Sequence, residues 1–295
     1  MSLKPVHALL AILVAAIWGF SFVVIKVGVS TVPPLLLTGL RFLFAAFPAI
    51  FFVRRPKAHF AYVAGYGFFV GVLQFGLLFV AIKQGLPAGL ASVVIQSQVF
   101  FTIGLAALLF GEKSKPVQIS GALIAIAGIA LIAWTRWAGA ALLPLLFCIG
   151  AAIAWSIANT LSKRSGEKNA LSFIVWASLT APVPLFVLSA LTEDYAAIMA
   201  TLTHPTWLSA ISIAYLAWPA TILGFGTWSF LLSRYPANQV SPFALLVPVF
   251  GLAGGIGLLG ETVQPLALAG SLLVLGGLIL TVLGPRIFAR QETLP

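Results

Sequence analysis

Charged residues are scarce in this sequence. Of its 295 residues only 7% are charged, whereas 61% are hydrophobic. Soluble domains carry about 25% charged residues, so this chain has too few to cover a water-facing surface. Its apolar runs, such as residues 8–25, are continuous and do not alternate with polar positions as barrel strands do. The composition therefore excludes a soluble globular domain and predicts helices that cross a lipid bilayer.

Cysteine, histidine and acidic residues are also rare. The chain has one cysteine, Cys148, with three histidines and six acidic residues. A lone cysteine allows neither a disulfide framework nor a cysteine-based metal site, and we expect no metal and no cofactor. No acidic residue or histidine falls in the middle of an apolar run. The sequence therefore argues against a membrane enzyme, which would need a Ser–His or His–Glu pair at that depth.

Breaks in the apolar pattern divide the chain into ten segments. A bilayer core about 30 Å thick is crossed by about 20 apolar residues, and each segment is close to that length. The expected helices are residues 6–29, 35–53, 60–82, 88–110, 117–134, 140–162, 170–191, 207–232, 239–259 and 266–283. The segment Thr192–Thr206 is expected to be the one long loop. The predicted fold class is all-α, a polytopic membrane protein with ten transmembrane helices.

Lysine and arginine are distributed unequally over the loops. The net charge of +10 lies in short flanks of apolar segments and not on one folded face, so nucleic acid is not an expected partner. With ten spans, Lys83 and Arg136 lie on one side. Twelve lie on the side of the N-terminus: Lys4, Arg54, Arg55, Lys57, Lys113, Lys115, Lys163, Arg164, Lys168, Arg234, Arg286 and Arg290. The positive-inside rule then places both termini in the cytoplasm, with the protein in a bacterial inner membrane.

One motif occurs twice along the chain. Gly111-Glu112-x3-Pro116-x4-Gly121-x6-Gly128 recurs as Gly260-Glu261-x3-Pro265-x4-Gly270-x6-Gly277, and residues 111–131 and 260–280 share seven identities. Each half then has five helices, and five is odd, so the second half enters the membrane from the opposite side. We expect two inverted five-helix repeats, residues 1–139 and 140–295, forming one transport unit. Inverted repeats are typical of transporters, whose substrate site lies near the midplane between them.

The chain resembles the EamA family of the drug/metabolite transporter superfamily over nearly its full length. The residues that carry the resemblance are Trp18-Gly19, Lys26, Pro34, Arg41-Phe42, residues 87–92 (PAGLAS) and both Gly-Glu helix ends. Within the family the chain is most similar to bacterial exporters of O-acetylserine and cysteine. The resemblance implies a carrier for small amino-acid metabolites. Many members have Gln-Pro where this chain has Gln98-Val99, so a gating or hinge role is expected for Pro248, and also for Pro219, but not for residue 99.

Polar and aromatic side chains fall at mid-depth in several predicted helices. Amides can hydrogen-bond both ends of a zwitterion, and aromatic faces attract an ammonium group. The candidate substrate-binding residues are Trp18, Ser21, Phe22, Gln74, Gln96, Gln98, Trp155, Asn159, Tyr215 and Trp218. For each amide the alternative is an interhelical hydrogen bond that only holds the bundle together. For each tryptophan the alternative to substrate binding is packing of the ring against neighbouring helices.

Four charged residues near or within the spans have two interpretations each. In one, Lys26 extends to the interface and Arg41 pairs with a helix-end carbonyl. In the other, both residues make an outward vestibule positive and attract a carboxylate. Glu112 and Glu261 are expected to pair with neighbouring helix ends, with ion coupling as the alternative. Because no titrating group lies at mid-depth, we expect transport down the substrate's own gradient by alternating access. The alternatives are export of other amino acids or amphipathic drugs, proton coupling, or a passive channel. The sequence does not predict an oligomeric state.

Overall fold

Ten helical spans form a bundle in the computed structural model, which describes residues 4–112, 115–136 and 142–291. The spans are Pro5–Thr31, Pro34–Phe51, Phe60–Lys83, Ala88–Phe110, Pro116–Thr135, Leu142–Ser165, Ala170–Thr192, Trp207–Arg234, Ser241–Leu259 and Pro265–Gly284. These bounds confirm the ten predicted helices and differ from them by no more than three residues. The expected boundary between residues 139 and 140, and Lys113, lie outside the described residues. The division into two repeats stays a prediction.

Several spans consist of more than one helical element. The first five spans comprise α1 (Pro5–Thr31), α2 (Pro34–Ala46) with η1 (Ala49–Phe51), α3 (Phe60–Gly67) with η2 (Phe68–Phe75) and α4 (Gly76–Lys83), α5 (Ala88–Val94) with η3 (Ile95–Ser97) and α6 (Gln98–Phe110), and α7 (Pro116–Arg136). The second five comprise α8 (Leu142–Ser165), α9 (Ala170–Ala177) with α10 (Pro182–Thr192), α12 (Trp207–Ala217) with η4 (Trp218–Leu223) and α13 (Gly224–Arg234), α14 (Ala237–Val240) with η5 (Ser241–Leu245) and α15 (Leu246–Leu259), and α16 (Pro265–Gln291).

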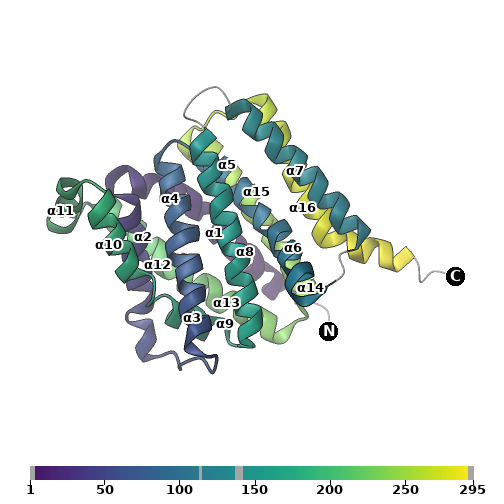
Figure 1. Cartoon of the computed structure of the whole chain (residues 1–295), viewed down its shortest axis with the longest axis horizontal. Coiled ribbons are helices and arrows are strands. Elements are labelled where there is room, and N and C mark those ends of the chain that lie inside the picture. The colour runs from purple at the N-terminus through teal and green to yellow at the C-terminus, as the bar shows by residue number, and fades with distance from the viewer. Residues whose placement is uncertain (1–3, 113–114, 137–141, 292–295) are drawn as a thin grey trace.

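The segment expected to be a long loop contains a helix. Residues Tyr195–Thr203 form α11, which projects from the bundle beside α10 (Figure 1). Asp194 caps this helix, because its Oδ1 accepts a hydrogen bond from the backbone N–H of Ala196 at 3.2 Å. An aspartate before an apolar stretch is a helix-start signal, and here it was present but read as part of a loop.

Two spans are interrupted by π-helical segments at corresponding places. η2 starts at Phe68 in the third span and η4 starts at Trp218 in the eighth, 150 residues later (218 minus 68). Proline has no N–H to donate, so Pro219 removes one bond of the α-helical ladder within η4. Single π-turns inside α-helices occur frequently at functional sites. The two segments therefore mark the third and eighth spans as places to look for a binding site.

The glycines of the repeated motif bring α7 and α16 into backbone contact. A Cβ added to Gly128 would lie 2.5 Å from the carbonyl oxygen of Gly270, and a Cβ on Gly270 would lie 2.7 Å from that of Gly128. A Cβ on Gly121 would lie 2.6 Å from the carbonyl oxygen of Gly277. Small residues allow such close helix packing in membranes. The two helices run side by side along one flank of the bundle (Figure 1).

Three glutamates from the second half of the chain each bind two backbone N–H groups in the first half. We call them the glutamate clamps: Glu167 binds Lys57 (2.6 Å) and Ala58 (3.3 Å), Glu193 binds Leu35 (2.7 Å) and Leu36 (3.1 Å), and Glu261 binds Ala88 (2.5 Å) and Gly89 (2.9 Å). Leu35 and Ala88 lie in the first turns of α2 and α5, where unpaired N–H groups and the helix dipole favour a negative charge. The expected pairing of Glu261 with a helix end is thus confirmed.

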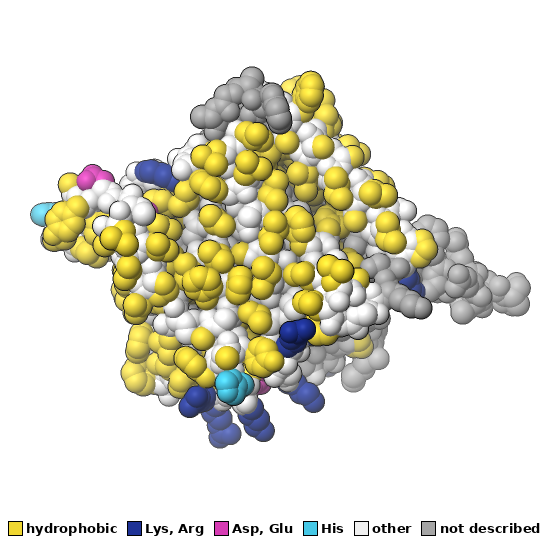
Figure 2. All heavy atoms as spheres, viewed as in Figure 1, with side chains coloured by type: hydrophobic (Ala, Val, Ile, Leu, Met, Phe, Trp, Pro, Cys, Tyr) yellow, Lys and Arg dark blue, Asp and Glu magenta, His cyan; other side chains and the backbone are white. Residues whose placement is uncertain are grey.

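Basic side chains gather at one end of the bundle. We call this the basic end, defined by Arg54, Arg55, Lys57, Lys163, Arg164, Lys168 and Arg234. Figure 2 shows lysine and arginine side chains at the lower edge of the molecule, below α3 and α9, with hydrophobic side chains covering the flank above. The opposite end carries Lys83, Glu193, Asp194 and Glu261. The apolar flank between two polar ends is what a helical membrane protein presents to lipid.

Candidate functional site

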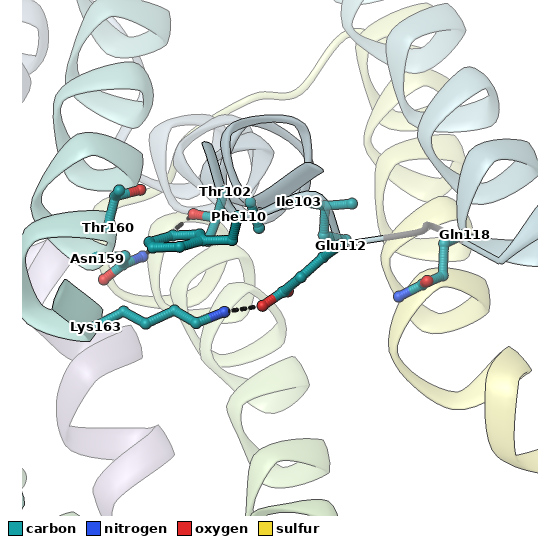
Figure 3. A pocket seen from close by; sticks show the side chains of 9 residues that line it. Thr102, Ile103, Phe110, Glu112, Gln118, Asn159, Thr160 and Lys163 are labelled. Atoms are coloured by element: carbon teal, nitrogen blue, oxygen red, sulfur yellow. Dashed lines mark hydrogen bonds and ion pairs between the residues drawn. The ribbon is translucent and has the colours of Figure 1, made fainter. Parts of the chain in front are cut away.

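A polar cavity of about 210 Å³ opens near the basic end, between α6, α7 and α8 (Figure 3). On the same measure one water needs about 10–15 Å³, so the cavity has room for a molecule much larger than water. The residues that line it are Thr102, Ile103, Ala106, Phe110, Glu112, Gln118, Asn159, Thr160 and Lys163. Its wall therefore combines hydroxyl and amide groups with one positive and one negative charge.

An amide network closes the inner part of this cavity. The Asn159 Nδ2 donates to Gln98 Oε1 at 2.9 Å and to Thr102 Oγ1 at 3.3 Å. The Thr102 hydroxyl donates in turn to Gln98 Oε1 at 3.2 Å. In the described chain, Asn159 Oδ1 and Gln98 Nε2 have no protein partner. Of these two atoms, Asn159 Oδ1 belongs to a residue that lines the cavity and can accept a hydrogen bond from a ligand.

An ion pair lies at the mouth of the cavity. Lys163 from α8 pairs with Glu112, which follows α6 (Figure 3). The two side chains are 50% and 53% exposed, and exposed ion pairs contribute only about 0–1 kcal/mol. The Lys163 Nζ also lies 4.6 Å from the centre of the Phe110 ring. Such a weak pair can be exchanged at little cost for a ligand that carries both an ammonium and a carboxylate group.

At the opposite end, α5 and α15 pack closely together. A Cβ added to Gly89 would lie 3.1 Å from the Cα of Leu252, and one added to Gly255 would lie 2.9 Å from the backbone nitrogen of Gly89. The Ser92 hydroxyl donates to the Pro248 carbonyl at 3.4 Å, and the Glu261 clamp binds the start of α5. The bundle is thus tightly closed at this end, beside α5, and hollow near the basic end, beside α6.

Three predicted aromatic residues tie helices together through polar contacts. Trp18 Nε1 donates to the Ala220 carbonyl at 2.9 Å, and the Tyr215 hydroxyl donates to the Ile17 carbonyl at 2.9 Å. Trp218 Nε1 donates to the Phe44 carbonyl at 3.1 Å, while its side chain is 49% exposed. None of the three is among the residues that line the cavity in the described structure.

The other predicted residues lie in the packed interior. Ser21 donates to the Ile17 carbonyl at 2.8 Å, and Phe22 is buried. Gln74 and Gln96 are buried as well, and Gln74 Oε1 has no hydrogen-bond partner in the described chain. Trp155 packs against two apolar clusters of the bundle.

Two predicted positively charged residues have different surroundings. Lys26 donates to the Ile82 carbonyl near the end of α4 at 3.4 Å. Arg41 is buried in α2 and donates to Thr221. It lines a second, narrower cleft between α2, α3, α9 and the two π-helical segments.

The cavity residues Thr102 and Lys163 are not among the residues predicted from the sequence. Both could have been found from helical spacing, because Thr102 follows Gln98 by four residues and Lys163 follows Asn159 by four. Residues four apart share one face of a helix. Gln98 and Asn159 were predicted, and the structure brings these two together with Thr102.

Comparison with known proteins gives consistent results over nearly the whole chain. The sequence model described as "EamA-like transporter family" matches residues 6–134 and 142–283. A protein of Salmonella typhimurium named "Probable amino-acid metabolite efflux pump" is 43% identical over 94% of this chain and 95% of its own length. A protein of Escherichia coli with the same name is 42% identical over the same shares. A solved crystal structure aligns with a TM-score of 0.60 at 19% identity, covering 96% of this chain and 99% of that one, a likeness that concerns the fold alone.

Proposed function

Because the chain belongs to the EamA-like transporter family, we propose that it exports small zwitterionic amino-acid metabolites, of the cysteine and O-acetylserine type, across a bacterial inner membrane. The observation that carries the proposal is the cavity near the basic end. It presents Lys163 for a carboxylate, Glu112 for an ammonium group and the amide of Asn159 beside them. Two relatives that are named as amino-acid metabolite efflux pumps support the substrate class.

The proposed orientation places the basic end and both termini in the cytoplasm. Basic loops stay on the cytoplasmic side of bacterial membranes, and the seven lysines and arginines that define the basic end gather there (Figure 2), with Lys83 at the opposite end. In this orientation the cavity faces the cytoplasm, and the closed end faces outward. A substrate made inside the cell then enters the cavity in the conformation described here.

We propose that the two repeated glutamates alternate as gates. Glu261 binds the start of α5 at Ala88 and Gly89, whereas its repeat equivalent, Glu112, pairs with Lys163 beside the open cavity. By the 149-residue offset (261 minus 112), Ala237 at the start of α14 corresponds to Ala88. In the outward-open state Glu112 would bind the start of α14 and Glu261 would release α5. Alternating access in inverted-repeat carriers follows from such an exchange between equivalent ends.

Counterflow into proteoliposomes tests the proposed function. Purified protein is reconstituted with unlabelled cysteine inside, and uptake of labelled amino acids is followed with and without an imposed pH gradient. We expect saturable exchange of small zwitterions, in which the label rises transiently above its final level and then decays to equal concentrations on both sides, with or without the pH gradient. Flux that does not saturate would indicate a channel. Accumulation above equilibrium when the pH gradient is imposed would replace the uniport proposal by proton coupling, with Glu112 as the first group to examine.

A further inference from the structure

Arg41 is a buried positive charge without a negative partner in the described chain. Its side chain is 3% exposed. Its Nε and Nη2 donate to Thr221 Oγ1 at 3.3 and 3.2 Å, while its Nη1 has no hydrogen-bond partner. Its guanidinium carbon lies 3.9 Å from the centre of the Phe75 ring. A charged group within a membrane span is costly unless it is paired or serves a function.

The acidic residues of the described chain are all engaged elsewhere. The three glutamate clamps bind backbone N–H groups at helix and loop ends, Asp194 caps α11, and Glu112 pairs with Lys163. Arginine keeps its charge under all ordinary conditions, so Arg41 does not escape the cost by losing a proton. A bound anion would supply the counter-charge that no described acidic residue provides.

The surroundings of Arg41 have the features of a ligand site. The cleft lies between the two π-helical segments, which contribute Val70, Gly71 and Phe75 from η2 and Thr221 from η4. The hydroxyl-bearing side chains of Tyr66 and Ser178 also line it. The guanidinium fork matches the two oxygens of a carboxylate, with Nη1 free to donate. Helices broken at equivalent positions of two repeats are where carriers of this architecture place their substrates.

The cleft is almost closed in this conformation. Its volume is about 10 Å³, and on this measure about 10–15 Å³ holds one water. A water could accept one hydrogen bond from Nη1 but would bring no charge. The backbones of α3 and α9 pack tightly beside the cleft, where a Cβ on Gly67 would collide with the Ala177 carbonyl oxygen. A ligand therefore reaches Arg41 only when α3 and α9 move apart.

We propose that Arg41 binds the carboxylate of the transported amino acid during its passage, after the substrate leaves the cavity near the basic end. This inference rests on the proposed function, because it takes the ligand to be the substrate. The substrate then occupies two binding sites in turn. The open cavity holds a zwitterion by paired opposite charges, and the Arg41 cleft selects for a free carboxylate. Amino-acid amides and esters lack the carboxylate that both sites bind, so they would bind more weakly in the cavity and be rejected at the Arg41 cleft.

The test compares an amino acid with its amide. Wild-type protein is placed in lipid discs of phosphatidylcholine alone, which contain no lipid carboxylate, and binding of L-cysteine and L-cysteinamide is measured, with counterflow of both in proteoliposomes. We expect wild type to prefer cysteine by about tenfold or more, as for a lost charge-assisted hydrogen bond. Arg41→Gln should lower this ratio about tenfold, to the smaller preference that Lys163 alone provides. Lys26→Gln is the matched control: it removes an intramembrane cation that binds only a carbonyl and should keep the preference.

A second variant keeps the test decisive if Arg41→Gln does not fold. Arg41→Lys retains the positive charge but loses the fork that binds two oxygens, and its preference for cysteine should fall about fivefold. An unchanged preference in either Arg41 variant, with transport intact, would overturn the inference and leave the proposed export standing. If wild type exchanges no amino acid at all, the proposed function fails and the inference fails with it.

Discussion

Replacing Glu261 by glutamine should shift the carrier toward its outward-open state. The Glu261 carboxylate accepts the N–H groups of Ala88 and Gly89 at 2.5 and 2.9 Å in the conformation described here. Glutamine keeps one acceptor oxygen and loses the charge, and hydrogen bonds to charged groups contribute about 1.5–3 kcal/mol each. Because this helix end is partly exposed, Glu261→Gln should destabilise the conformation described here by about 1–2 kcal/mol. This changes the equilibrium constant between this conformation and the outward-open state about 5- to 30-fold.

Cysteine accessibility measures this shift. Thr102→Cys, made in a Cys148→Ser background, places a thiol in the cavity near the basic end. A membrane-impermeant maleimide added from the opposite side reacts in proportion to the small outward-open population. Its rate should rise about 5- to 30-fold when Glu261→Gln is added, because the rate follows that population.

Glu193 offers a matched control for this experiment. It binds two N–H groups at the start of α2, as Glu261 does at the start of α5, but it does not lie between α5 and α15. Glu193→Gln should leave the labelling rate from the opposite side unchanged. Equal effects of the two substitutions, or no effect of Glu261→Gln, would refute the gate and leave Glu261 with a purely structural role.

Three further outcomes are expected. Cysteines introduced at Arg55 and at Asp194 should be labelled from the cytoplasmic and the external side respectively, and labelling of both from one side would contradict the ten-span topology. Asn159→Ala removes two hydrogen bonds in the cavity and should raise the KM for amino-acid exchange about tenfold. Thr160→Val is the control and should change the KM little, because the Thr160 hydroxyl binds only a backbone carbonyl. Equal effects of the two substitutions would argue that the amide network does not bind substrate. The backbone N–H of Asn169 is the main group that holds the pKa of the Glu167 carboxyl below its usual value. Ionised Glu167 therefore stabilises the fold above the ordinary glutamate pKa of about 4.3, and this stability is lost as the pH falls through the lowered pKa. The unfolding temperature of Glu167→Gln should accordingly be lower than that of wild type at neutral pH, and the two temperatures should become equal in acid. A difference in unfolding temperature that is the same at every pH would refute this role of Glu167.

The helical framework could be read from the sequence because length and hydrophobicity determine it almost alone. A span needs about 20 apolar residues whatever its neighbours are, so Pro34–Phe51 and the other spans follow from the pattern. The helix α11 was missed because its nine residues are too few to cross a membrane and lie between two spans. The π-helical segment η4 has a local signal in Pro219, but η2 contains no proline and could not have been anticipated.

The site was only partly predictable because it depends on contacts between distant helices. Gln98 and Asn159 were selected as polar residues at depth, which is a property of each helix by itself. That they bind one another, and that Lys163 pairs with Glu112, depends on how α6 packs against α8. Trp218 was selected on the same reasoning, yet its ring is half exposed and its N–H binds a neighbouring backbone carbonyl.

The direction of the glutamate clamps bears on how the chain evolved. All three carboxylates belong to the second half, and all six N–H groups that they bind belong to the first. If the two predicted repeats descend from one duplicated half, we infer that the contacts of Glu167 and Glu193 diverged after the duplication, whereas Glu261 keeps a counterpart in Glu112. In the conformation described here the first half supplies the N–H groups of the clamps and the second half supplies the carboxylates. Fragments ending and starting near the predicted boundary should therefore assemble as unlike pairs when produced together, and two copies of the first fragment should not form a carrier.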